Sequence, residues 1–151
     1  MSERATRKSM GGVWGFLGAA TIGMGVVSCS GSKPAPTPPA FAGSITLEAA
    51  EERARAEGRV VVAVATADWC APCQSYKRGA LSDAPVNAWL EAHAVPVLID
   101  VTKGMTPDAE RLGVSPIPAT FVLRDGEIVA QHAGVLTSQK LMRMLESASA
   151  Q

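Results

Sequence analysis

The chain has no excess of either charge and very little histidine. Its 151 residues contain 14 Lys and Arg, 14 Asp and Glu, and 2 His. Nucleic-acid binding rests on clustered cations that neutralise phosphates, and no basic run appears after the first residues of the chain. We therefore expect no nucleic-acid partner. The hydrophobic content of 47% is that of a globular protein, and the length suits one domain with tails.

Cysteine is scarce as well, which limits metal chemistry. The chain has three cysteines, Cys29, Cys70 and Cys73. A zinc site needs about four ligands, and only the last two cysteines are closely spaced. The other soft donors, His93 and His132, lie far apart in the sequence and on different predicted elements. We therefore expect no metal site.

The first cysteine follows a stretch that is typical of an export signal. Positive charges near the N-terminus precede an almost uncharged segment, residues 10–28, which is rich in Gly, Ala, Val and Met. The segment and the next residue end in VVSC, which resembles a bacterial lipobox, the motif in which signal peptidase cuts before a cysteine that receives lipid. By that resemblance residues 1–28 are a lipoprotein signal peptide and Cys29 carries acyl chains. An uncleaved transmembrane anchor is the alternative, since about 19 apolar residues are just enough to span a bilayer.

Both interpretations place the rest of the chain outside the cytoplasm, on the periplasmic face if the cell is Gram-negative. Stable anchoring by lipid needs at least two acyl chains, because one gives only marginal membrane binding. Assigning Cys29 to lipid also leaves Cys70 and Cys73 as a closed pair, with no stray thiol in an oxidising compartment. The cysteine count therefore favours the lipobox.

A segment rich in proline and alanine follows the first cysteine. Residues 31–43 read GSKPAPTPPAFAG, a composition that predicts extended polyproline conformations and no buried core. We therefore predict that residues 29–43 are a lipidated cysteine and a tether. The remaining residues, 44–151, are long enough to form a single core and are predicted to be the folded domain.

Hydrophobic patterns in this domain alternate between helix and strand. A continuous β-branched run at 59–66 predicts a strand buried on both faces, and the cysteine pair follows it directly. Further strands are predicted at 95–101, 120–124 and 127–132, the last two joined by a tight turn. Helices are predicted at 46–57, 74–81, 86–93, 107–112 and 138–147. This order predicts an α/β fold with a mixed central sheet and helices on its faces.

The closely spaced cysteines stand in the sequence ADWCAPC. Pro72 suits the first turn of a helix, so Cys70 is expected at a helix N-terminus, where free N–H groups and the helix dipole favour thiolate over thiol. Thiolate is the nucleophile in disulfide exchange. Cys70 would attack a substrate disulfide, and Cys73 would resolve the mixed disulfide. A purely structural disulfide is the alternative, although so short a loop gains little from closure entropy.

Three features of the domain together resemble the thioredoxin family: ADWCAPC after a buried strand, SPIPATFVLRDGEIV further on, and Gly134 after the hairpin. The resemblance implies a thioredoxin-like three-layer α/β/α sandwich. It also implies a cis Ile117–Pro118 bond against the cysteines, with the Ile117 backbone presented to a substrate strand; a trans bond in a plain turn is the alternative. Within the family, TADWCAPC with LSDAPVNAWL looks most like the periplasmic thioredoxin-like domains of DsbD-type transporters.

The resemblance also assigns residues around the cysteines and exposes one departure. Trp69 and Pro72 are implied as substrate contacts, with core packing as the alternative for Trp69. Thioredoxins commonly place a buried Asp six residues before the first cysteine, and this chain has Val64 there. Asp68 and Lys77 are charged residues near the pair, and both are expected to be solvated.

The expected function is that of an extracytoplasmic, membrane-anchored thiol-disulfide oxidoreductase. It would reduce protein disulfides as a monomer, draw electrons from a thiol donor and use no cofactor beyond the Cys70–Cys73 disulfide. Two alternatives stay open: the same chemistry run as a disulfide donor, and a non-catalytic lipoprotein that holds a partner beside Trp69 and Pro118.

Overall fold

The computed structural model describes residues 33–43 and 45–150. Four strands form one sheet in the order β2-β1-β3-β4. Central strand β1 is parallel to β2 and antiparallel to β3, and β3 and β4 form an antiparallel hairpin. The strands are β1 Val60–Thr66, β2 Ala94–Asp100, β3 Ala119–Arg124 and β4 Glu127–Ala133. The sheet is therefore mixed, as predicted.

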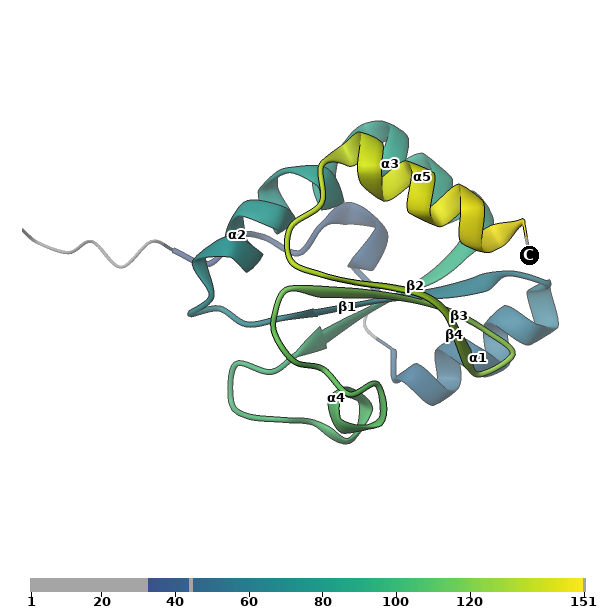
Figure 1. Cartoon of the computed structure of the whole chain (residues 1–151), viewed down its shortest axis with the longest axis horizontal. Helices are drawn as coiled ribbons and strands as arrows, with labels where there is room; N and C mark the ends of the chain where they lie inside the picture. The colour runs from purple at the N-terminus through teal and green to yellow at the C-terminus, as the bar shows by residue number, and fades with distance from the viewer. Residues whose placement is uncertain (1–32, 44, 151) are drawn as a thin grey trace, which may run out of the picture. The chain divides into compact units, whose positions relative to one another are not determined.

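Helices cover both faces of this sheet (Figure 1). Helices α1 and α4 lie on one side, and α2, α3 and α5 lie on the other. The α-helices are α1 Leu47–Glu57, α2 Ala71–Arg78, α3 Ala84–His93, α4 Pro107–Arg111 and α5 Ser138–Ser149. Two short 3-10 turns, η1 Pro39–Phe41 and η2 Ala80–Ser82, complete the described elements. The arrangement confirms the predicted α/β/α layers.

Strand β1 carries the two hydrophobic cores, one on each face. All seven of its residues are buried, because helices pack on both sides of the sheet. Since side chains alternate along a strand, Val61, Ala63 and Ala65 pack with α1, whereas Val62 and Val64 pack with helices of the opposite layer. The carboxyl end of this rigid strand leads directly into the loop that bears the cysteines.

The ends of α1 follow local rules that the sequence shows. The Thr46 hydroxyl accepts the N–H of Ala49 at 3.2 Å, and the helix ends at Gly58, whose φ of 63° is left-handed. A side-chain oxygen at this position satisfies a free N–H of the first turn, and glycine adopts the left-handed conformation without a steric penalty. The predicted helix at 46–57 is confirmed.

The predicted tether is wrong for the part that the structure describes. Residues 33–43 pack on the domain: Phe41 is 1% exposed within the core, and the N–H of Ala40 donates to Asn87 Oδ1 at 2.8 Å. Prolines leave this segment few N–H groups to satisfy, and buried side-chain amides accept hydrogen bonds from two of those that remain.

The predicted signal peptide and Cys29 lie outside the described residues. Among the described residues, no helix is long and apolar enough to cross a membrane.

Candidate active site

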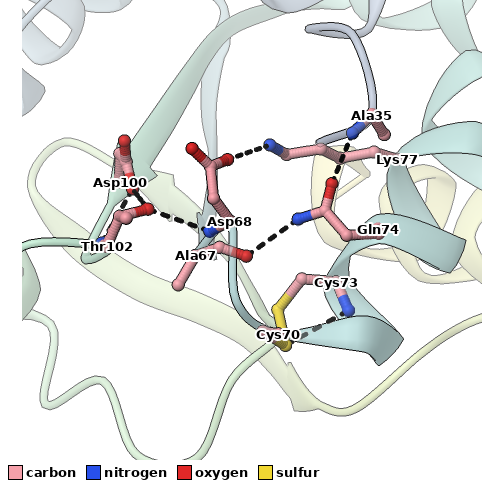
Figure 2. Close-up of a disulfide and its surroundings, with 9 residues drawn as sticks. All are labelled: Ala35, Ala67, Asp68, Cys70, Cys73, Gln74, Lys77, Asp100 and Thr102. Atoms are coloured by element: carbon pink, nitrogen blue, oxygen red, sulfur yellow. Dashed lines mark hydrogen bonds and ion pairs between the residues drawn. A yellow bond between two sulfur atoms is a disulfide. The ribbon is translucent and has the colours of Figure 1, made fainter. Parts of the chain in front are cut away.

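Cys70 and Cys73 form a disulfide at the N-terminus of α2 (Figure 2). Their Cα atoms are 5.2 Å apart. Cys70 is the N-cap residue, and its Sγ accepts the N–H of Cys73 at 3.2 Å, while Pro72 occupies the first turn. Cys70 is 7% exposed and Cys73 is 1% exposed. Cys70 is therefore the more accessible of the two cysteines, and Cys73 lies one helical turn behind it.

The Ile117–Pro118 peptide bond is cis, as predicted, and so is the Ser115–Pro116 bond before it. Strand β3 begins directly after Pro118, which is buried. Ile117 packs against the hydrophobic cluster that contains both cysteines. The fold thus brings two segments together that are far apart in the sequence, the cysteine loop and the loop before β3.

A groove of about 300 Å³ opens beside these loops. Its lining contains no charged side chain: Trp69, Val101, Gly104, Met105, Val114, Ser115, Pro116 and Ile117. Trp69 and Met105 are 68% and 51% exposed. The indole N–H of Trp69 donates to the carbonyl of Thr102 at 3.2 Å, which fixes the ring at the rim. Core packing of Trp69, the alternative interpretation, is wrong; the predicted contacts Trp69 and Ile117 line one groove, whereas Pro72 lies on α2.

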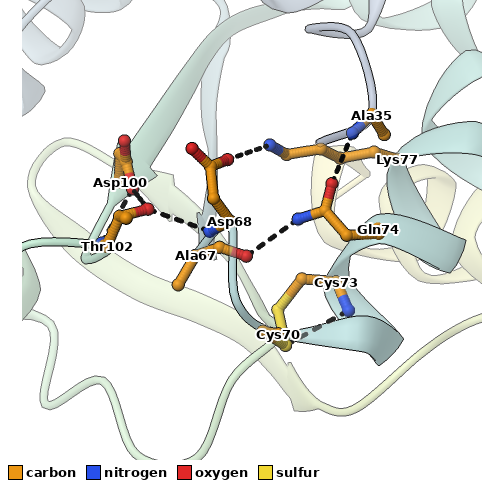
Figure 3. A network of polar contacts seen from close by, with 9 residues as sticks. All are labelled: Ala35, Ala67, Asp68, Cys70, Cys73, Gln74, Lys77, Asp100 and Thr102. Carbon is orange, nitrogen blue, oxygen red and sulfur yellow. Dashed lines mark hydrogen bonds and ion pairs between the residues drawn. A yellow bond between two sulfur atoms is a disulfide. The ribbon is translucent and has the colours of Figure 1, made fainter. Parts of the chain in front are cut away.

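Polar contacts also hold the cysteine loop (Figure 3). The Asp68 N–H donates to Thr102 Oγ1 at 2.9 Å, and the Asp68 carboxylate lies 3.7 Å from the Lys77 ammonium. Lys77 is 6% exposed, so the prediction of a solvated lysine is wrong; the exposed Asp68 agrees with its prediction. Helical geometry explains the burial, because Lys77 follows Cys73 by one turn and shares its inward face.

Gln74 is a site residue that the sequence interpretation missed. Its side chain is 4% exposed and hydrogen-bonds the carbonyl of Ala67 at 2.8 Å, in the loop before Cys70. It follows Cys73 directly on α2, on the buried side of that helix. Glutamine is usually a surface residue, so its type gave no reason to expect burial. The only feature of the sequence that could have indicated burial was its position directly after Cys73 in the helix.

The position of the family's buried Asp is apolar here. Val64 is fully buried, and its cross-strand partner is Thr120 on β3. The Thr120 hydroxyl lies 3.0 Å from the Tyr76 hydroxyl of α2. Burial raises the pKa of Tyr76 to about 12, so this hydroxyl stays protonated at neutral pH. Neutral hydroxyls therefore occupy this part of the interface between the sheet and α2.

Within the described ranges, no group of three or more His, Cys, Asp or Glu side chains is placed to hold a metal ion. His93 contacts the Trp89 carbonyl at 3.0 Å, and His132 lies on β4. The two histidines belong to separate elements, as the sequence predicted.

The chain is similar to thioredoxins of known structure. A thioredoxin from Thermus thermophilus is 25% identical, with a TM-score of 0.58 over 76% of this chain and 86% of that one. The germline-specific thioredoxin Deadhead from Drosophila melanogaster is 25% identical, with a TM-score of 0.57 over 71% of this chain and 98% of that one. A mutant thioredoxin from Halobacterium salinarum is 26% identical, with a TM-score of 0.55 over 76% and 96% of the two chains.

A comparison with curated proteins finds no match. The model of a thioredoxin-like domain family matches residues 47–149, which include the cysteine pair and every strand of the sheet. The match covers more than half of the chain and agrees with the α/β/α layers and the disulfide at the start of α2. The chain therefore belongs to the thioredoxin-like domain family.

Proposed function

We propose that this thiol-disulfide oxidoreductase reduces disulfides of other proteins. The observation that carries the proposal is the unequal placement of the two sulfurs at the N-terminus of α2. Cys70 is the more exposed cysteine and receives an N–H hydrogen bond, and both features suit a nucleophilic thiolate. Cys73 is buried one helical turn behind it, which suits the resolving thiol.

The reaction consists of two thiol-disulfide exchanges. The Cys70 thiolate of the reduced protein attacks one sulfur of the substrate disulfide, which forms a mixed disulfide and releases one substrate thiolate. The Cys73 thiolate then attacks Cys70 Sγ, which closes the Cys70–Cys73 disulfide and releases the second substrate thiolate. Two electrons pass to the substrate, and the protons of the two cysteine thiols balance those that its sulfurs take up. A dithiol donor restores the reduced protein by the same exchanges in reverse.

The uncharged groove supports a protein substrate. Trp69, Met105, Pro116 and Ile117 offer apolar surface beside the disulfide, and such surface gains free energy when an apolar segment covers it. An extended segment that places apolar side chains next to its disulfide fits this lining. A small charged disulfide finds no charged partner among the lining residues of the groove.

The reducing direction is proposed over the disulfide-donor direction. Thioredoxins are resembled at two places: by Ala71 and Pro72 between the cysteines, and by Ile117 before the cis proline. The similar solved structures are also named thioredoxins. Equilibration with a series of glutathione ratios tests the direction. A potential near that of thioredoxin, about −270 mV, supports a reductant, and one near about −120 mV contradicts it.

A lipid anchor on Cys29 outside the cytoplasm is part of the proposal. It is supported by the VVSC motif after an apolar segment and by the closed pairing of the other two cysteines. The Cys29→Ala variant should lose acyl labelling and signal cleavage at that site, and mass spectrometry of the purified protein measures both. Unchanged acyl labelling of the variant contradicts the lipid site, and a parent protein that carries no acyl label and keeps residues 1–28 supports the uncleaved transmembrane anchor.

A further inference from the structure

Gln74 joins three parts of the molecule that lie far apart in sequence or belong to different elements. Its Oε1 accepts the N–H of Ala35 at 2.6 Å, and its Nε2 donates to the carbonyl of Ala67 at 2.8 Å (Figure 3). The side chain is 4% exposed, so water cannot readily replace either partner. One buried amide therefore connects the N-terminal segment, the loop before the cysteines and helix α2.

Gln74 is also connected by hydrogen bonds to the backbone on both sides of the Cys70 side chain. The Ala67 carbonyl that accepts the Gln74 amide also accepts the N–H of Cys70 at 3.2 Å. The Cys70 carbonyl in turn accepts the backbone N–H of Gln74 at 3.1 Å. On the N-terminal side of Cys70, Gln74 and Cys70 thus share the Ala67 carbonyl as acceptor. On the C-terminal side, the Gln74 N–H donates directly to the Cys70 carbonyl.

The N-terminal partner is itself fixed to the domain. We call residues 33–41 the docked segment. Besides the bond from Ala35 to Gln74, the segment is held by the N–H of Ala40, which donates to Asn87 Oδ1 at 2.8 Å, and by Phe41, which is 1% exposed. If the docked segment left, the Gln74 oxygen would lose its partner at a buried position, which is unfavourable.

We propose that Gln74 is a positioning residue for Cys70 and that it couples the docked segment to the redox centre. The inference rests on the proposed role of Cys70 as the nucleophile. In the reduced protein a Cys70 held in place keeps its sulfur against the N–H of Cys73, an interaction that favours thiolate. Displacement of the docked segment, by a partner protein or by tension on the chain from an anchor, releases Gln74 and lowers the reactivity of Cys70.

The test measures the reactivity of Cys70 alone. The full-length chain carries Cys29→Ala and Cys73→Ala, so that Cys70 is the single thiol, and its alkylation by iodoacetamide is followed from about pH 5 to 10. In this background Gln74→Met removes both amide hydrogen bonds with little change in shape. Ala35→Pro removes the N–H that reaches Gln74 and places ring atoms at this buried contact, so it undoes the docking of Ala35 on Gln74 in a sequence that already has proline on either side. Thr37→Pro is the matched control, because it adds a proline to the docked segment at an exposed residue whose N–H makes no hydrogen bond to any residue that the structure describes.

The alkylation rate at pH 7 is expected to fall about threefold to tenfold in Gln74→Met and about twofold to threefold in Ala35→Pro, the range that one or two neutral hydrogen bonds support. The midpoint of the rate profile should move to higher pH in both, with the plateau at high pH unchanged. Thr37→Pro should match the parent. A parent-like profile for Gln74→Met overturns the positioning role; a parent-like profile for Ala35→Pro, or an equal change in Thr37→Pro, overturns the coupling.

Alkylation also separates this inference from the proposed function. It reports the thiolate of Cys70 whether or not the protein reduces protein disulfides. Shifted profiles together with no reduction of insulin by the unmodified protein contradict the proposed function and leave the role of Gln74 standing. Parent-like profiles together with active insulin reduction contradict the inference alone.

Discussion

The two flanks of the disulfide are built in opposite ways. The polar flank, defined by Asp68, Gln74 and Lys77, ties the cysteine loop to α2 through the hydrogen bond from Gln74 to the Ala67 carbonyl and the ion pair of Lys77 with Asp68. The apolar flank is the groove at Trp69, which is 68% exposed and has no charged residue in its lining. Satisfied polar contacts fix atoms in place, whereas exposed apolar surface gains free energy when it is covered. The polar flank therefore positions the cysteines, and the apolar flank is suited to bind substrate.

The largest effect is expected from a charge placed in the core beneath the polar flank. Val64→Asp puts a carboxyl group at a fully buried position, which should lower the free energy of unfolding by several kcal/mol. Burial raises the pKa of such a carboxyl above its unfolded value, so stability should fall further as the pH rises through the folded pKa. Urea unfolding from about pH 5 to 9 measures this. Val64→Thr is the neutral control, and equal losses in both variants at every pH would contradict the charge effect.

On the apolar flank, Trp69→Ala should weaken substrate binding and leave stability nearly unchanged. A well-covered aromatic contact is typically worth about 2 kcal/mol, so KM for insulin reduction should rise about tenfold to thirtyfold. The exposed ring contributes little to the folded core. Steady-state kinetics and a thermal melt of the same sample separate the two effects. A large fall in melting temperature with unchanged KM would show that the indole serves the fold and not the substrate.

The ion pair of the polar flank should respond differently to removal of each partner. Asp68→Asn leaves the Lys77 ammonium buried without its carboxylate and should cost about 1 kcal/mol, less than a fully buried pair because Asp68 is partly exposed. Lys77→Met replaces the cation with apolar volume and should be neutral or slightly stabilising. Urea unfolding of both variants and of the double variant measures the coupling. Equal losses in the two single variants would contradict a burial cost at Lys77.

The ionisation of Tyr76 should have the smallest effect at neutral pH and should lower stability only in alkaline solution. Its folded pKa is raised to about 12 by burial, above an unfolded value near 10, so its contribution to stability is complete below about pH 10 and is lost as the pH rises through 12. Tyr76→Phe should remove this term, which is at most about 1.4 kcal/mol per pH unit. Unfolding curves at pH 8, 10 and 11 for both proteins make the comparison. Parallel slopes above pH 10 would contradict a buried, titrating hydroxyl.

The fold could be predicted from the sequence because its signals are local. The β-branched run at 59–66 predicted a strand that is found at Val60–Thr66, and a threonine and a glycine marked the two ends of α1. The cysteine pair after that run likewise predicted the disulfide at the start of α2. Each of these depends on neighbours within a few residues, which a pattern along the chain records.

The parts that were missed depend on partners far along the chain. The N–H of Ala35 donates to the side-chain oxygen of Gln74, which lies 39 positions further along the chain. Neither the docking of the proline-rich segment nor the burial of the amide can therefore be predicted from neighbouring residues in the sequence. Lys77 was expected in solvent because lysine usually is, yet its helical position and the Asp68 carboxylate accommodate it in the interior. Composition alone predicts a free tether and a surface charge at these places.

Mixed-disulfide trapping tests most directly whether Cys70 is the nucleophile and Cys73 the resolving thiol. Reduced Cys73→Ser protein is mixed with insulin, and the products are separated on a non-reducing gel and identified by mass. Cys70→Ser and a parent protein that keeps both Cys70 and Cys73 are treated alongside, and all three carry Cys29→Ala. We predict that Cys73→Ser accumulates a disulfide between Cys70 and insulin without turnover, that Cys70→Ser forms no adduct, and that the parent protein releases reduced insulin. Multiple turnover by Cys73→Ser, or an insulin adduct on Cys70→Ser, would contradict this division.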